Sequence, residues 1–257
     1  AEALLRSEGI ADRSLWGPEF EFYIFDKIIY RDDINISYYR IDSDEADWNT
    51  DAEEGHNLGG KIPRHGGYHA MPPLDKLYNL RAEMSRQVED AGIPVKYHHH
   101  EVGGPGQSEI EIELLTMERA ADAAMLIKYI TRMVARDAGK TVTYMPKPLY
   151  NEAGSGMHFH QLLVDAQGKS LFYDKDSYAG LSKLARQYIG GVLRHGKALL
   201  ALTNPSTNSY KRLVPGFEAP VTLCYGLANR SAAVRIPKYV DNEAEKRIEF
   251  RPPDGTC

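Results

Sequence analysis

The chain has 257 residues, of which 42% are hydrophobic and 26% charged, and its net charge is −5. This length can bury a large core in one big domain or two small ones. The acidic balance argues against a nucleic-acid or anionic-membrane partner, and no run of 18 apolar residues is present that would predict a membrane-spanning helix.

Residues 1–16 are interpreted as the tail of a helix and a linker, and residues 17–257 as one domain. The segment from Gly17 to Phe25 alternates, which predicts a strand with Glu19 and Glu21 on one face and Phe20 and Phe22 on the other. The flanking aromatic residues favour burial of the two carboxylates, and buried carboxylates must be paired or metal-bound. A solvated edge strand is the alternative.

The polar residues 26–60 are interpreted as a hairpin and a loop without chemistry, and residues 61–73 as a loop punctuated by Gly and Pro. Apolar spacing and glycine stops predict three helices, at about 73–92, 117–138 and 178–202. Their apolar positions are typical of a core.

The stretch from His98 to Leu115 is the most informative. Three histidines and Glu101 precede a glycine-rich turn, and a strand follows in which glutamates alternate with aliphatic residues. The glutamates are Glu109, Glu111 and Glu113. Because glutamate is depleted in strands, this acidic face needs either solvent or divalent cations against it.

Three later segments add histidines and arginines. His158 and His160 share one face of a predicted strand after a Gly-Ser-Gly turn. Residues 208–220 and 229–237 are predicted as polar loops or a short strand, and 247–252 as a strand with Arg247, Glu249 and Arg251 on one face. An exposed ladder of ion pairs is the common explanation of such alternation.

Together these faces favour a metal-dependent phosphoryl-transfer or ligase chemistry. Carboxylates with one or two imidazoles suit Mg²⁺ or Mn²⁺, and arginines suit phosphate and carboxylate groups. The sequence contains no Walker A sequence and no kinase glycine loop, so the ATP site would be of another kind. A metal-free acidic module is the simpler alternative, but the arginines and aromatic flanks argue against it.

Eight segments, in order along the chain, resemble signatures of the bacterial type I glutamine synthetase family. They are GPEFEF, KIPRHGGYHAMPP, HHHEVGGPGQSE, MPKP, AGSGMHFH, NSYKRLVPGFEAP, NRSAAVRIP and RIEFRPPDGT. The charged strands and intervening helices fit the α+β class, with helices on the outer face of a curved antiparallel sheet. The resemblance implies the same shape, a half-barrel that lines the site.

The resemblance also implies residue roles. Metal ligands would be Glu21, Glu101 and Glu109 at one position and Glu19, His158 and Glu249 at another, for two or three Mg²⁺ or Mn²⁺ ions. Glutamate would be held by Gly154, Arg212, Arg230 and Arg251, and ATP by His160, Arg235 and Arg247. Catalytic roles would fall to Glu218, Arg230 and Tyr68, with Glu218 on a flap that closes the site and helps to deprotonate ammonium.

The implied reaction is the ATP-dependent ligation of ammonia to the side-chain carboxylate of glutamate, through an acyl phosphate. Two departures from the family pattern, Ala153 and Leu162, bear on substrate identity. A ligase for polyamines or other amines is therefore the main alternative. A catalytically silent binding protein is another, although every candidate metal ligand is present.

The resemblance further implies an N-terminal β-grasp domain, a C-terminal helical part and a homo-dodecamer with active sites between subunits. Neither part lies within residues 1–257, so we expect this chain alone to be weakly active or inactive. Two cysteines, Cys224 and Cys257, and the lack of a visible signal peptide favour a cytoplasmic location.

Overall fold

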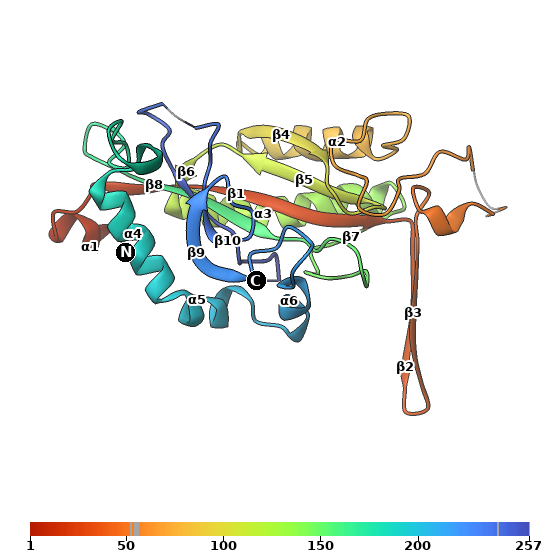
Figure 1. Cartoon of the computed structure of the whole chain (residues 1–257). Helices are drawn as coiled ribbons and strands as arrows, with labels where there is room; N and C mark the ends of the chain where they lie inside the picture. Colours follow the sequence, from red (N-terminus) through yellow and green to blue (C-terminus); the bar gives the residue numbers. More distant parts are fainter. Residues whose placement is uncertain (52, 54–56, 241, 257) are drawn as a thin grey trace.

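The computed structural model describes residues 1–51, 53, 57–240 and 242–256. Its core element is a nine-stranded open sheet in which β4-β5-β1-β8-β11-β10-β9 are neighbours, while β6 and β7 also pair with β1 (Figure 1). The strands of this sheet are β1 (Arg13–Phe25), β4 (Val95–His100), β5 (Gln107–Ile112), β6 (Leu115–Thr116), β7 (Thr141–Thr143), β8 (Met157–Val164), β9 (Thr222–Leu227), β10 (Ala232–Ile236) and β11 (Ile248–Phe250). All pairings are antiparallel except β9 with β10.

The helices flank this sheet, which gives the predicted α+β class. They are α1 (Glu2–Ser7), α2 (Tyr78–Asp90), α3 (Met117–Asp137), α4 (Lys183–Arg194), α5 (Gly196–Thr203) and α6 (Thr207–Arg212), with 3-10 turns at Asp47–Asn49 and Tyr178–Gly180. Among the described residues no helix is both long and apolar enough to cross a membrane.

Strand β1 sets which side of the sheet is apolar. Phe20, Phe22 and Ile24 pack with β5 residues against α2 and α3 in the main core. A second core joins β8, β10 and β11 to α4. The period-two alternation therefore sends the glutamates of β1 to the opposite face, as the sequence predicts.

The register then aligns the polar residues of neighbouring strands. Glu21 lies opposite Glu109, and Glu19 lies opposite Glu111 on one side and His158 on the other. Like charges directly opposite each other destabilise a sheet. A face built in this way needs counter-charges or cations.

The predicted hairpin is present as β2 (Lys27–Asp33) and β3 (Ile36–Asp42), a separate two-stranded sheet that projects from the body as an arm (Figure 1). Its side chains are largely exposed, including Tyr30, Ile34 and Tyr39.

Several element boundaries differ from the sequence expectations. Strand β1 begins at Arg13, within the segment expected to be a linker. The helix expected at 178–202 is two helices, because the chain bends at His195 and brings Gly196 against β9, where a Cβ would lie 3.0 Å from Leu223 Cδ2. The first part of the loop expected at 208–220 is α6, which starts at a capping box of Ser206 and Ser209. The first long helix begins at Tyr78 rather than near residue 73.

Candidate metal and phosphate site

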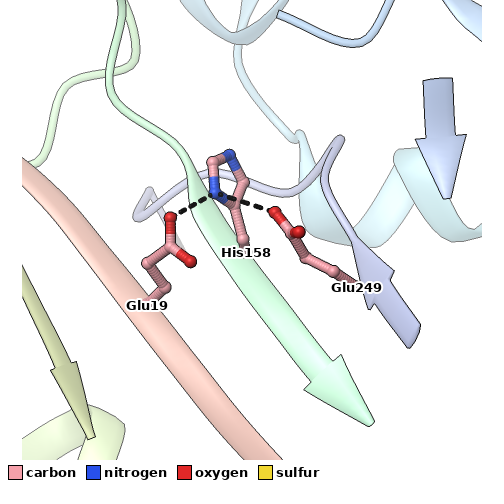
Figure 2. A group of neighbouring side chains, drawn as sticks. All are labelled: Glu19, His158 and Glu249. Atoms are coloured by element: carbon pink, nitrogen blue, oxygen red, sulfur yellow. Dashed lines mark hydrogen bonds and ion pairs between the residues drawn. The ribbon is translucent and has the colours of Figure 1, made fainter. Parts of the chain in front are cut away.

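The first cluster brings together Glu19, His158 and Glu249 from the adjacent strands β1, β8 and β11 (Figure 2). His158 Nδ1 lies 2.9 Å from Glu19 Oε1 and 3.6 Å from Glu249 Oε1. All three residues are buried. Neighbouring strand positions thus converge on one point, with atoms of the kind that Mg²⁺ and Mn²⁺ accept.

Two arginines pair with the Glu249 carboxylate. Arg251 Nε donates to Glu249 Oε1 at 2.9 Å, and Arg235 Nε donates to the other oxygen. Burial would raise the pKa of the Glu249 carboxyl, but Arg235 and the other nearby cations outweigh it and lower the pKa. Glu249 is therefore a fixed, ionised group.

A neighbouring cluster shares Glu19 with the first and adds His160 and Glu111. His160 Nε2 lies 3.3 Å from Glu19 Oε2 and 3.7 Å from Glu111 Oε1. Burial opposes ionisation of Glu19, yet His158 and His160 bring its pKa well below the usual value. Glu111 is 2% exposed, and within the described part of the chain no hydrogen-bond partner is found for its Oε2.

The family resemblance assigns Glu111 no role, although the alternation of its strand places it on the acidic face. Its Oε1 accepts from Lys96 Nζ at 2.8 Å, so Lys96 partly balances its charge. The free Oε2 leaves this carboxylate able to take a further donor or a cation.

The second predicted ligand set, Glu21, Glu101 and Glu109, lies on β1, just after β4, and on β5. Burial and repulsion from Glu21 raise the pKa of Glu101 to about 8. Burial and the neighbouring glutamates raise the pKa of Glu109 well above its usual range. His99 Nε2 lies 3.2 Å from Glu109 Oε1, which adds an imidazole that the resemblance did not include.

These donor sets fit divalent cations. Burial and then like-charge crowding raise the pKa values of Glu101 and Glu109, and a cation bound between them would offset both effects. The oxygen-rich sets with one or two imidazoles suit Mg²⁺ or Mn²⁺ better than structural zinc. No thiolate takes part among the described residues.

A cavity of about 430 Å³ lies beside these clusters, and Glu249 is not among its lining residues. Many of the predicted site residues line it: Glu19, Glu21, Tyr68, Glu101, Glu109, His158, Glu218, Arg230, Arg235 and Arg251. The Arg230 guanidinium lies 5.4 Å from the centre of the Tyr68 ring. His160 and Arg247 lie together behind this cavity, with Arg247 Nε 3.4 Å from His160 Nδ1, and both are buried.

A smaller recess beside it contains Gly154 and Arg212 together with Ala153 and Glu218. Arg212 is buried and donates to the Pro252 carbonyl at 2.8 Å and to His158 Nε2 at 3.1 Å, so it also orients a metal-ligand candidate. Ala153 lines this recess. Leu162, the other departure, lies in the second core and not at either cavity.

The whole chain, residues 1–257, matches the family model described as glutamine synthetase, catalytic domain. It is 53% identical to a Streptomyces coelicolor glutamine synthetase over 256 residues, which is 100% of this chain and 54% of that protein. It is 54% identical to a Frankia alni glutamine synthetase, again over 100% of this chain and 54% of the relative.

Among solved structures, a Plasmodium falciparum glutamine synthetase determined by cryoEM superposes with a TM-score of 0.89 at 36% identity. That alignment covers 98% of this chain and 50% of the other. The chain thus spans about half the length of the curated relatives it matches. It belongs to the glutamine synthetase family through its catalytic domain.

Proposed function

We propose that the chain provides the metal and phosphate machinery of an ATP-dependent glutamate–ammonia ligase. The observation that carries the proposal is that two carboxylate clusters share β1 and lie along one cavity that arginines also line. This combination suits phosphoryl transfer, in which catalysis is mostly positioning and neutralisation of charge.

In the proposed reaction the side-chain carboxylate of L-glutamate attacks the terminal phosphorus of ATP and gives an acyl phosphate and ADP. Ammonia then attacks the acyl carbon, and phosphate leaves with the bonding electrons. Glu21, Glu101 and Glu109 would hold one divalent ion, around the Glu109 carboxylate that clusters with Glu101 and His99 and also with Glu21 and Glu19. Glu19, His158 and Glu249 would hold another. Bound Mg²⁺ or Mn²⁺ would supply Lewis-acid charge neutralisation at the phosphate oxygens.

The arginines that line the cavity would neutralise the transferred phosphoryl group. Arg230 and Arg235 reach the cavity, and Arg247 with His160 would support the nucleotide from behind it. Arg212, Arg251 and the Gly154 backbone would hold the glutamate carboxylates through charge-assisted hydrogen bonds.

Glu218 would accept the proton that ammonium loses, with Tyr68 across the cavity. It is exposed and has a positive φ of 55°, which is a costly backbone conformation for glutamate. The preceding residue, Phe217, is anchored by the Lys147 ammonium 3.7 Å from its ring centre. This anchor supports a flap that carries Glu218 over the reacting groups and excludes water.

The architecture of the whole enzyme is part of the proposal. We propose a cytoplasmic homo-dodecamer in which an N-terminal domain completes the neighbouring site, with residues 17–257 as part of the catalytic domain. This chain alone would then make little glutamine. Robust glutamine synthesis by residues 1–257 would contradict that part of the proposal.

One observation favours a second candidate. Ala153 supplies no side-chain amide to the recess that contains Arg212 and Glu218. The same metal and phosphate machinery could therefore serve a ligase that joins glutamate to a polyamine or another amine. The full-length enzyme with ATP and glutamate, given either ammonium or putrescine, would distinguish glutamine from a γ-glutamyl amine by mass spectrometry.

The first test is calorimetric titration of Mn²⁺ into the purified chain, with and without a non-hydrolysable ATP analogue. Glu21→Ala and Glu249→Ala should each abolish one site. Glu113→Ala is the control, because Glu113 directly follows β5, the strand of Glu109, but is exposed. Binding that survives both site substitutions, or no binding at all, would contradict the proposed metal positions.

A further inference from the structure

A buried carboxylate behind the metal clusters has no part in the proposed reaction. Glu45 follows β3 in an irregular segment, is 1% exposed and lines neither cavity described above. Its Oε1 accepts from the Lys76 amide at 2.8 Å. Its Oε2 accepts from His100 Nε2 at 3.0 Å and from the Gly106 amide at 3.0 Å.

The two donors to Glu45 Oε2 lie at the two ends of one turn. His100 immediately precedes Glu101, and Gly106 immediately precedes the strand that carries Glu109. A single oxygen atom therefore fixes both ends of the glycine-rich turn that separates two candidate metal ligands.

His100 also contacts the backbone of Glu101. Its Nδ1 donates to the Glu101 carbonyl at 2.7 Å, so the ring joins the Glu45 carboxylate to the ligand's backbone. Gly67 packs so tightly on this ring that a Cβ there would collide with it, and the Gly67 amide donates to the Val102 carbonyl at 3.1 Å. The segment that carries Tyr68 rests on the same support.

We propose that Glu45 is a positioning residue for the cation site of Glu101 and Glu109. It acts through His100 and Gly106, and it sets the spacing of the two ligands without touching the ion. The inference rests on the proposed function, since it presumes a cation at that pair. Partners of metal ligands typically change affinity by about 10- to 100-fold when removed.

The test compares Mn²⁺ affinities of the unmutated chain and Glu45→Gln by calorimetry. Glu45→Gln replaces one carboxylate oxygen by an NH₂ group. In either orientation of the amide, this NH₂ donor faces a donor that the carboxylate accepts from, either the Lys76 amide or the pair of His100 Nε2 and the Gly106 amide. We expect the site that Glu109→Gln abolishes to weaken about tenfold or more. The site that Glu249→Ala abolishes should keep its affinity, which a general loss of structure would not allow.

Two further variants keep the result decisive. Thr131→Val removes a buried hydrogen bond to Tyr144, 2.8 Å long, within the core behind the sheet, and should lower stability without changing either affinity. Glu45→Asp retains the charge but shortens the side chain, so it should fold and weaken the same site by less than Glu45→Gln.

Equal affinities in Glu45→Gln and the unmutated chain would overturn the inference while leaving the proposed function intact. Weakening of both sites to the same extent would also overturn it, because Glu45 would then be merely structural. If Glu45→Gln does not fold, an unchanged affinity in Glu45→Asp is the overturning result. A chain with no Mn²⁺ site that depends on Glu109 would refute the proposed metal position and this inference together.

Discussion

The carboxyl groups of Glu101 and Glu109, on either side of a glycine-rich turn, each have an oxygen within 4.8 Å of the other. Carboxylates this close repel each other, which favours a proton on one of them. Burial and the repulsion of Glu21 act in the same direction and raise the pKa of Glu101 to about 8. The pair therefore keeps at neutral pH a proton that a cation would displace.

Mn²⁺ binding at this pair should release about one proton per ion at pH 7, because metal ligands bind as anions. The measurement is calorimetry in two buffers of different ionisation enthalpy. The site at Glu19 and Glu249 allows a comparison of the carboxyls alone, since its third ligand, His158, must also be unprotonated to bind a metal. The pKa values of both carboxyls there are already lowered, so their ionisation should contribute no proton. A binding enthalpy at the Glu101 site that is independent of buffer would contradict this prediction.

Metal-free stability should fall as the pH rises from about 4.5 to about 8. Between the ordinary Glu pKa of 4.5 and the raised pKa of Glu101, about 8, the folded chain binds more protons than the unfolded chain. The contribution of the Glu101 carboxyl to the free energy of unfolding is complete below pH 4.5. It is lost as the pH rises through about 8. Urea unfolding at several pH values with a chelator would show this slope, and Glu101→Gln should flatten it. Glu113→Gln, at an exposed position, should leave the slope unchanged.

Arg251→Gln should destabilise the chain by about 3 kcal/mol, because it leaves the buried Glu249 carboxylate with one of its two arginines. The matched control is Arg86→Gln. Arg86 pairs with Glu83 and Asp90 on the surface of α2, its side chain is 58% exposed, and such pairs contribute less than about 1 kcal/mol. Urea unfolding of both variants would measure the difference, and equal losses would show that Glu249 does not depend on Arg251.

Leu162→Ala should cost about 3 kcal/mol of stability and leave Mn²⁺ affinity unchanged, since Leu162 is 1% exposed within the second core. Leu126→Ala on α3, at 44% exposure, should change stability by less than about 0.5 kcal/mol. Thermal unfolding and Mn²⁺ titration would test both statements. Altered metal binding in Leu162→Ala would mean that this position does act on the site.

Period-two alternation made the charged strand faces predictable. The placement of Glu19 and Glu21 opposite Phe20 and Phe22, and of Glu249 opposite Ile248, follows from local sequence alone. The order of the strands does not follow from alternation. It is seen only in the structure, which places β8 and β5 on the two sides of β1. The chemical roles of the individual site residues remain predictions.

Other features of the structure are not indicated by any local pattern in the sequence. Glu45 lies in a polar stretch without periodicity, and its burial depends on donors at residues 76, 100 and 106, which are distant in the chain. The bend at His195 was missed because the apolar spacing continues through it, and the nearness of Leu223 to Gly196 is a tertiary feature that the local sequence does not indicate. His99 is one of three consecutive histidines in the sequence, which does not show which of them is a ligand. Only the pairing of β4 with β5 places His99 beside Glu109.

The position of β1 at the centre of the sheet has a consequence for how the chain folds. β1 pairs with β5 and β8, which lie far along the chain, and closing such long loops is slow. The clusters that contain Glu19 cannot form before those pairings, so their cation affinity arises only in the late, non-local stage of folding. Mn²⁺ added during refolding should therefore report completion of the sheet, with a signal that lags behind helix formation.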